Sequence, residues 1–267
     1  MLIEVEKLIP DVVQIAVNAG KAIMMVYNTE FEVEKKLDKS PVTQADLAAH
    51  DIIVAGLGAL ETVYPVLSEE EISVPFSTRR NWRTYWLVDP MDGTREFVKR
   101  NGEFVVSIAL IHQHEAVLGV IYAPFLHTVY FASQHGGAYK QQAGDVMQSL
   151  QTRAAPITPV IAGSRSHSDK RMTDYLQKLG DHQLIAMGSA LKSCLVAEGS
   201  ADLYLRLGLT SEWDTAAAQC IVEEAGGYFV DTQGQRLLYN TKAELLNPEF
   251  LVYGDASRDW RRYLNAL

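Results

Sequence analysis

Three acidic segments of the chain contain side chains that can do chemistry. Each follows an apolar run or opens a helix: Leu67-Ser68-Glu69-Glu70-Glu71, Val88-Asp89-Pro90-Met91-Asp92-Gly93-Thr94 and Glu212-Trp213-Asp214-Thr215. Loops at strand ends and helix starts are where rigid scaffolds place catalytic groups. These three segments are therefore the first candidates for an active site.

The second segment predicts a metal site. Pro90 fixes φ and Gly93 permits a tight turn, so the carboxylates of Asp89 and Asp92 can converge on one side. Two carboxylates held so close repel each other unless protons or cations intervene. Such oxygen ligands suit Mg²⁺, and no His/Cys cluster with the spacing of a zinc site is present. The simpler alternative is an Asp-Pro-x-Asp-Gly surface turn.

The same stretch could also belong to a phosphatase that uses an aspartate as nucleophile. Those enzymes carry Asp-x-Asp-Gly-Thr after an apolar strand, whereas here two residues separate Asp89 from Asp92. The wider spacing puts the second aspartate on the wrong side of the turn for its acid/base role. We therefore predict direct attack by water, without a phosphorylated enzyme.

The elements that must position these residues change character along the chain. Apolar residues at helical spacing predict a helix over residues 5–27, and a second helix begins near Thr43. Strands are predicted over 85–89, 103–111, 116–123, 128–133 and 137–140, which is an antiparallel meander. From about residue 158 strands and helices alternate, so we predict an N-terminal α+β half over 1–150 and a C-terminal α/β half over 151–267.

Composition narrows the classes of function. The 267 residues are 48% hydrophobic and carry a net charge of −9. This charge disfavours polymeric nucleic acid and anionic membranes as partners. Early charges argue against a signal peptide, and we expect no transmembrane segment and a cytoplasmic location. The two cysteines, Cys194 and Cys220, are interpreted as buried reduced thiols, and Arg79-Arg80-Asn81-Trp82-Arg83 as a solvated basic loop.

Taken together, these motifs resemble the inositol monophosphatase superfamily. The resemblance covers nearly the whole chain and rests on the order and separation of the three acidic segments. It also rests on motifs around them, which are Ser40-Pro41-Val42-Thr43-x-Ala45-Asp46, Glu96-Phe97-x-Lys99-Arg100-Asn101-Gly102-Glu103-Phe104, Ser164-Arg165-Ser166-His167 and Gly188-Ser189-x-Leu191-Lys192. The resemblance implies the layered α/β/α/β/α sandwich of the sugar phosphatases.

The resemblance also implies residue roles. Two or three Mg²⁺ ions would be held by Glu69, Asp89, the carbonyl of Met91, Asp92 and Asp214. Asp46 would orient the hydroxyl of Thr94, which with Glu69 activates the attacking water. Substrate contacts are expected from Glu69, Met91, Asp92, Gly93, Thr94, Arg165, His167, Ser189, Lys192 and Asp214. The helix start near Gly188 and Ser189 is a candidate cradle for a second phosphate.

Within the superfamily the chain looks most like the bacterial 3'(2'),5'-bisphosphate nucleotidases. The implied reaction converts adenosine 3',5'-bisphosphate to AMP and phosphate, inhibited by lithium, in the setting of sulfate assimilation. Peripheral attachment to the cytoplasmic side of the inner membrane is left open. The alternatives are an inositol or sugar monophosphate phosphatase of the same superfamily and a catalytically silent phosphate-binding regulator.

Overall fold

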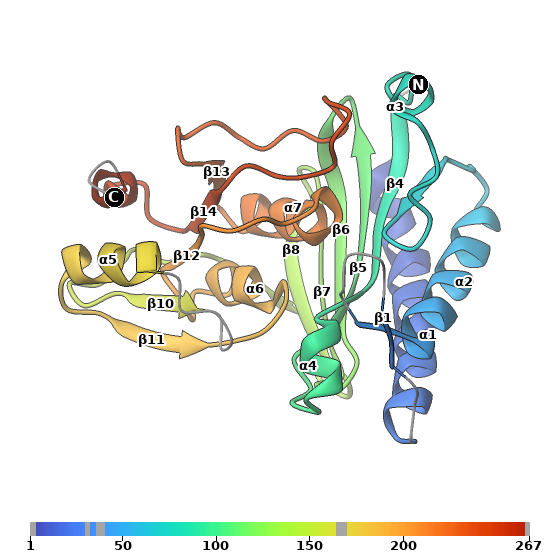
Figure 1. The fold of residues 1–267 in the computed structure, drawn as a ribbon, viewed down its shortest axis with the longest axis horizontal. Helices are drawn as coiled ribbons and strands as arrows, with labels where there is room; N and C mark the ends of the chain where they lie inside the picture. Colours follow the sequence, from blue (N-terminus) through green and yellow to red (C-terminus); the bar gives the residue numbers. More distant parts are fainter. Residues whose placement is uncertain (1–3, 30–32, 36–40, 164–169, 265–267) are drawn as a thin grey trace.

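The computed structural model describes residues 4–29, 33–35, 41–163 and 170–264. Its layers run across Figure 1 from one side to the other: helices α1 and α2, a seven-stranded sheet, helices α6 and α7, a five-stranded sheet and helix α5. This is the α/β/α/β/α arrangement that the sequence predicts. The fold class is therefore confirmed.

The outer helical layer consists of α1 (Ile9–Tyr27), preceded by the short 3-10 helix η1 (Val5–Leu8), and α2 (Gln44–Gly58). One face of α1 buries Val12, Ile15, Ala19 and Ile23 against α2 and the strands beneath. Two short strands, β1 (Val33–Lys35) and β2 (Pro41–Thr43), pair in antiparallel fashion ahead of α2.

The helical stretch Val5–Tyr27 is long and apolar enough to cross a membrane by length and composition alone. The sequence predicts no transmembrane segment, and this one helix among the described residues meets the length and hydropathy that a span requires. The apolar side of α1 nevertheless packs on α2 and on the seven-stranded sheet, and both cover the same cluster of buried residues. That packing is the role of an amphipathic helix on the surface of a folded globular protein.

The seven-stranded sheet has the order β3-β4-β5-β6-β7-β8-β9. Its strands and the short helices between them are β3 (Val66–Ser68), α3 (Phe76–Arg79), β4 (Thr84–Asp92), α4 (Thr94–Val98), β5 (Val105–His112), β6 (Glu115–Ala123), β7 (Thr128–Ser133), β8 (Gly137–Gln142) and β9 (Gln148–Ser149). Every pair of neighbours from β4 onward is antiparallel, as predicted for the meander. Only β3 runs parallel to β4.

The five-stranded sheet has the order β11-β10-β12-β14-β13. The second half of the chain contains β10 (Val160–Gly163), α5 (Lys170–Leu179), β11 (Gln183–Ala186), α6 (Leu191–Ala197), β12 (Leu203–Arg206), the 3-10 turn η2 (Glu212–Asp214), α7 (Ala216–Glu224), β13 (Tyr228–Asp231), β14 (Phe250–Tyr253) and the 3-10 helix η3 (Trp260–Tyr263). The chain thus changes sheet between Ser149 and Val160. The division at residue 150 stays a prediction, since α6 and α7 share one buried core with both sheets.

Helix α7 lies very close to the seven-stranded sheet. A Cβ at Gly119 of β6 would lie 2.3 Å from the carbonyl oxygen of Ala217, so only glycine allows this approach. Since α7 directly follows the turn that holds Asp214, the contact fixes the position of that turn relative to β4 and β5.

Candidate active site

A β-bulge near the end of β4 brings Asp89 and Asp92 to the same face. Asp89 pairs with Ser107 and Asp92 pairs with Val105, so β4 uses one residue more than β5 over this interval. Residues three apart on a regular strand point to opposite faces, and one extra residue restores the same face. Gly93 then turns the chain into α4 at a φ of 100°. The predicted convergence of the two carboxylates is therefore explained by a bulge.

The parallel pairing of β3 and β4 places Glu69 beside Asp89. Ser68 is aligned with Val88, and the backbone N–H of Glu69 donates to the carbonyl of Val88 over 3.1 Å. The next residue along each strand is therefore an acid at the same edge of the sheet. This juxtaposition connects the first two acidic segments of the sequence.

The third acidic segment forms the turn η2. The backbone N–H of Ser211 donates to Oδ2 of Asp214 over 2.8 Å, and the Ser211 side chain accepts a bond from the backbone of Asp214. This reciprocal capping box fixes the carboxylate of Asp214 at the start of α7. One ligand atom from each of Asp89, Asp92 and Asp214 lies within 4.8 Å of the other two.

These three carboxylates strongly disfavour one another's charge. Burial, together with Glu69 and the other two aspartates, raises the pKa of Asp89 well above its usual value. Burial raises the pKa of Asp92 to about 6, although Lys192 opposes that shift. Burial and the charge of Asp92 raise the pKa of Asp214 to about 8. Clustered negative charge of this kind is stabilised by protons or by a cation.

The remaining predicted catalytic groups surround this cluster. Asp46 is buried in the first turn of α2, near enough to Asp89 to contribute to the rise in its pKa. Thr94 opens α4, and its hydroxyl donates to the carbonyl oxygen of Met91 over 3.5 Å. The backbone N–H of Met91 in turn donates to Oδ1 of Asp89 over 3.0 Å. Their predicted roles stay proposals.

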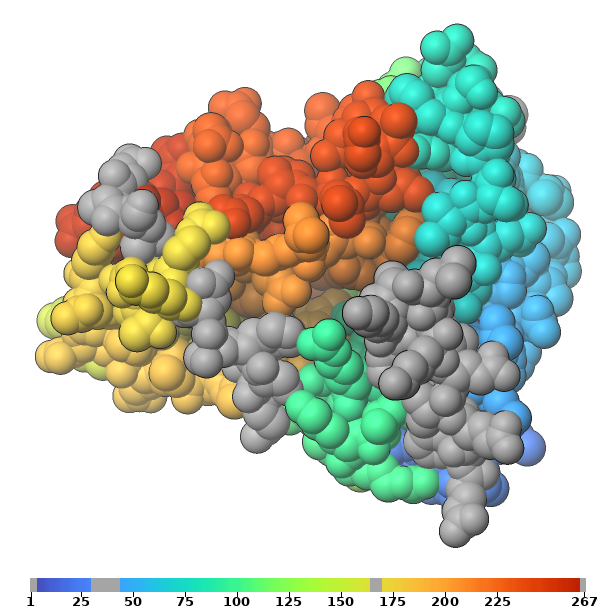
Figure 2. Space-filling model, in the orientation of Figure 1, coloured from blue at the N-terminus to red at the C-terminus, as the bar shows by residue number. Residues whose placement is uncertain are grey.

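A cavity of about 530 Å³ joins the cluster to the second half of the chain. Its wall includes Glu69, Asp89, Met91, Asp92, Gly93, Thr94, Ser189, Lys192, Arg206 and Asp214. In Figure 2 the teal and green residues of the first half adjoin the orange and red residues of the second half. The cavity is thus built by both halves: its lining includes the three clustered carboxylates, two basic side chains of the second half, Lys192 and Arg206, and Arg95 of the first half.

The turn at Gly188 and Ser189 differs from the predicted phosphate cradle. The backbone N–H of Gly188 donates to Oε2 of Glu103 over 2.8 Å, and that of Ala190 donates to Oδ2 of Asp92 over 2.6 Å. Carboxylates of the first half therefore already occupy two of the N–H groups expected to bind a phosphate. Helix α6 is also short, with seven residues. Two of the N–H groups at this turn are therefore engaged and connect the two halves, and the phosphate cradle stays a prediction.

Lys192 is buried and is part of this turn. Its ammonium group donates to the carbonyl of Ser189 over 2.6 Å and to that of Met187 over 3.4 Å, and it lies 5.2 Å from the centre of the Tyr204 ring. Burial lowers its pKa to about 8, while the charge of Asp92 opposes this shift. Of the two open interpretations, surface lysine and substrate contact, the first is wrong.

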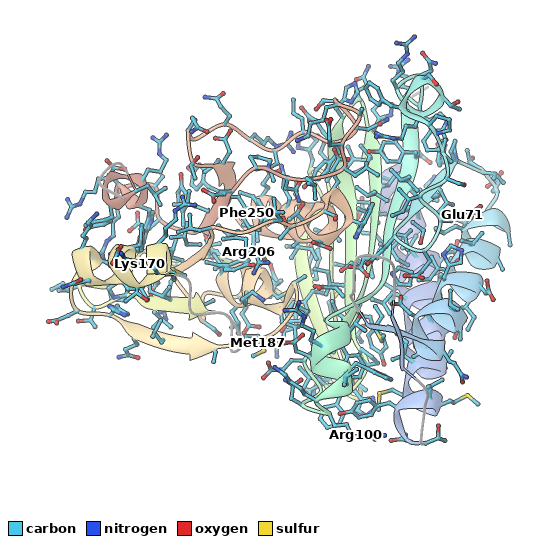
Figure 3. All side chains as sticks on the ribbon, in the orientation of Figure 1. Glu71, Arg100, Lys170, Met187, Arg206 and Phe250 are labelled. Atoms are coloured by element: carbon cyan, nitrogen blue, oxygen red, sulfur yellow. The ribbon has the colours of Figure 1, made fainter. Side chains whose placement is uncertain are left out.

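Sequence reasoning missed Arg206, at the end of β12. Figure 3 shows Arg206 and Phe250 between the five-stranded sheet and helices α6 and α7, and both line the cavity. Nη2 of Arg206 donates to the carbonyl of Leu209 over 3.1 Å, and its buried Nε has no hydrogen-bond partner among the described residues. A charged residue that ends the apolar strand Leu203-Tyr204-Leu205 is the signal that could have identified it. Arg165 and His167 lie outside the described residues.

The donor set fits a hard divalent cation. The grouping of Asp89, Asp92 and Asp214 offers only carboxylate oxygens. Burial, with a contribution from neighbouring carboxylates, raises their pKa values, and a bound cation would offset both effects. Carboxylates without His or Cys ligands are the coordination that Mg²⁺ and Ca²⁺ prefer. The site is therefore suited to a metal ion of this class.

Comparison with known proteins shows the family to which the chain belongs. Residues 4–259 match the model of the inositol monophosphatase family. The chain is 51% identical over 247 residues to the 3'(2'),5'-bisphosphate nucleotidase CysQ of Salmonella typhimurium, covering 92% of this chain and 99% of the relative. It is 40% identical over 258 residues to CysQ of Haemophilus influenzae, covering 96% of each.

Solved structures show the same similarity. The crystal structure of CysQ from Bacteroides thetaiotaomicron matches with a TM-score of 0.82 and 38% identity, covering 97% of this chain and 100% of that one. An inositol monophosphatase from Thermotoga maritima matches with a TM-score of 0.77 and 25% identity, covering 95% of each chain. The sequence similarity therefore extends to the whole fold.

Proposed function

This chain belongs to the inositol monophosphatase family, and we propose that it is a 3'(2'),5'-bisphosphate nucleotidase that converts adenosine 3',5'-bisphosphate to AMP and phosphate. It is then a phosphoric monoester hydrolase, the class to which a 3'(2'),5'-bisphosphate nucleotidase, the name that its relatives carry, belongs. The observation that carries the proposal is a single cavity lined by three clustered carboxylates, by Lys192 and Arg206 of the second half and by Arg95 of the first half.

Mg²⁺ is the proposed metal, with two or three ions. Glu69, Asp89, Asp92, Asp214 and the carbonyl of Met91 would hold it, since these groups are oxygen donors at one side of the cavity. When bound, the metal supplies neutralisation of the phosphate charge and a lower pKa for the attacking water.

The chain itself would position and deprotonate the water. Thr94 and Glu69 line the cavity beside Asp89, where they can accept hydrogen bonds from a water next to the phosphate. Asp46 would orient the Thr94 hydroxyl from the first turn of α2. The carboxylate of Asp89 accepts the N–H of Met91, and this hydrogen bond fixes its orientation beside the proposed water site.

The basic side of the cavity would distinguish a bisphosphate from a monophosphate. Arg206 has a buried N–H directed to no described acceptor, and a guanidinium group is well suited to a phosphate. Ser189, whose Oγ is buried without a partner among the described residues, lies on the same wall. Arg165 and His167 remain proposed nucleotide contacts. Inositol 1-phosphate has no second phosphate to use these groups.

A cytoplasmic location in the setting of sulfate assimilation is part of the proposal. Both cysteines are buried and free, as expected for a reducing compartment, and this confirms how they were interpreted from the sequence. The packing of α1 on the sheet favours a globular protein over a membrane-anchored one. The proposed partner is a small nucleotide bisphosphate, as the name of the relatives indicates.

The test is phosphate release by the purified protein from adenosine 3',5'-bisphosphate, with Mg²⁺ and with excess chelator. We expect AMP as the product, loss of activity in the chelator and a lower kcat/KM for inositol 1-phosphate. A preference for inositol 1-phosphate would instead identify an inositol phosphatase. Absence of release from any phosphate ester, despite Mg²⁺ binding, would identify a silent regulator.

A further inference from the structure

Arg79 is buried, although the sequence places it in a basic segment interpreted as a solvated loop. It ends the short helix α3, and only 2% of its surface is exposed, whereas its neighbour Arg80 is exposed. A buried arginine needs partners for its fixed set of N–H donors. The residues that satisfy Arg79 come from the far end of the chain.

The partner of Arg79 is Asn240, in the segment between β13 and β14. The guanidinium donates from Nη1 to Oδ1 of Asn240 and from Nη2 to the carbonyl of Ala243. The amide of Asn240 returns a bond from Nδ2 to the carbonyl of Arg79 over 2.6 Å. Asn240 is 1% exposed and has a φ of 56°, a conformation that asparagine adopts more readily than most residues. The pair therefore forms a reciprocal buried connection.

The connection continues to the turn that holds Asp214. The backbone N–H of Asn240 donates to both carboxylate oxygens of Glu212, over 3.0 and 2.9 Å. Glu212 is 2% exposed, and its own N–H donates to the carbonyl of Leu245 over 2.8 Å. Glu212 is the first residue of η2 and Asp214 is the last. The network thus reaches the turn from outside the cavity.

We propose that Arg79 and Asn240 are positioning residues that brace the turn η2, so that Asp214 is held against the repulsion of Asp89 and Asp92. This rests on the proposed function in one respect, namely that Asp214 is a metal ligand. α3 lies between Glu69 and β4 in the chain, so the brace ties the segment that supplies the other carboxylates to the turn that supplies Asp214. Neither Arg79 nor Asn240 lines the cavity.

The physical need for a brace follows from the charges. Asp214 faces two other carboxylates within 4.8 Å, and in their ionised forms they repel one another. A turn free to relax would move Asp214 away and lose the geometry that a bound cation requires. Hydrogen bonds made directly to a metal ligand commonly set its orientation, and removing them costs about 10- to 100-fold in metal affinity. Arg79 and Asn240 act on Asp214 through Glu212, so the lower end of that range is expected for them.

The test is the Mg²⁺ dissociation constant, measured by titration calorimetry on the full-length protein with no substrate present. Arg79→Met and Asn240→Gly should each weaken Mg²⁺ binding by about tenfold, and the double variant should be little worse than either alone, because both act on one network. Glycine at 240 tolerates the positive φ. Arg79→Lys should recover part of the affinity, and Arg80→Met is the matched control on the exposed neighbour.

Thermal unfolding in chelator separates positioning from stability. A lower melting temperature with an unchanged Mg²⁺ dissociation constant in Arg79→Met and Asn240→Gly, measured well below melting, would overturn the brace. Additive losses in the double variant would also overturn it. If the parent protein itself binds no Mg²⁺, the proposed function fails, and the brace fails with it. If the parent binds and the variants bind equally well, only the brace fails.

Discussion

The carboxylate side and the basic side of the cavity are built from opposite charges, and their charges are satisfied in different ways. Asp89, Asp92 and Asp214 face one another, and their raised pKa values show that folding holds them in an unfavourable arrangement. Lys192 instead donates to two carbonyl groups of its own turn. The carboxylates therefore favour binding of protons or of a cation, whereas Lys192 already has partners.

This difference in how the charges are satisfied indicates which side of the cavity takes part in catalysis and which side contacts the rest of the substrate. Repelling carboxylates are costly to fold and are explained by the metal chemistry of phosphate transfer. Of the two basic residues, Lys192 holds the turn together and Arg206 retains a buried donor. We therefore propose that the carboxylate side performs catalysis and that the basic side selects the substrate, with Arg206 as its main contact. The four predictions below test this division.

The largest effect is expected for Asp89→Asn. Asp89 lies at the centre of the cluster, so removing its charge should weaken the binding of every ion there. We expect a fall in kcat of at least roughly 100-fold, equivalent to ~2.7 kcal/mol of barrier, for both a nucleotide bisphosphate and inositol 1-phosphate. The matched control is Asp51→Asn, on the exposed face of α2. Retention of more than about a tenth of the parent activity would exclude a central role.

The second prediction concerns Arg206→Ala. Loss of a charge-assisted contact to the second phosphate should lower kcat/KM for adenosine 3',5'-bisphosphate by roughly 10- to 100-fold, which corresponds to ~1.5–3 kcal/mol. The value for inositol 1-phosphate should change little. Steady-state kinetics on both substrates measure this, with the exposed Arg80→Ala as control. Equal losses on the two substrates would remove Arg206 from the discrimination.

The third prediction tests the turn that connects the two sides. In Gly188→Ala the new Cβ would lie 2.7 Å from Cγ of Glu96 and 2.8 Å from the carbonyl oxygen of Glu103, so the turn must shift. Overpacking by a methyl group costs ~1–3 kcal/mol, and we expect a roughly tenfold lower kcat/KM for the bisphosphate. Gly58→Ala, with open space around the added methyl group, is the control. Unchanged kinetics in Gly188→Ala would show that the turn tolerates displacement.

The smallest effect is a dependence of stability on pH in the metal-free protein. The folded-state pKa is about 8 for Asp214 and about 6 for Asp92, above the value of ~3.9 for an unfolded chain. The folded protein then binds protons more tightly than the unfolded chain, so stability falls as the pH rises from about 4 to about 8.

In chelator we therefore expect the melting temperature to decrease by roughly 2–5 °C between pH 6 and pH 8. Saturating Mg²⁺ should remove or reverse the decrease, because the metal binds the ionised carboxylates. Asp214→Asn should show a weaker dependence than the parent. A melting temperature that rises with pH in chelator would contradict the assigned repulsion.

Much of this arrangement could be predicted from the sequence because its signals are local. The strands of the meander and the alternating second half follow from short apolar runs and the turn residues between them, and the structure confirms their order. Asp89, Asp92 and Asp214 stand out because acids follow apolar runs or open a helix, and the structure brings these three together. Pro90 and Gly93 indicate a turn, but the bulge that aligns the carboxylates depends on pairing with β5, which local sequence does not reveal.

The parts that sequence reasoning missed depend on contacts between distant segments. The N–H groups of Gly188 and Ala190 would be free in an isolated helix start, but Glu103 and Asp92 accept them in the folded protein. The burial of Arg79 depends on Asn240, 161 residues further along the chain. The helix over Val5–Tyr27 was predicted, but not that its length and hydropathy meet those of a membrane span.

The most direct measurement of the central claim is kcat/KM for adenosine 3',5'-bisphosphate and for inositol 1-phosphate, in the parent protein, Asp89→Asn and Arg206→Ala. We predict that the parent prefers the bisphosphate, that Asp89→Asn loses activity on both substrates, and that Arg206→Ala loses mainly the preference. If Arg206→Ala lowers both values alike while the parent's preference persists, the division between a catalytic side and a selecting side is contradicted.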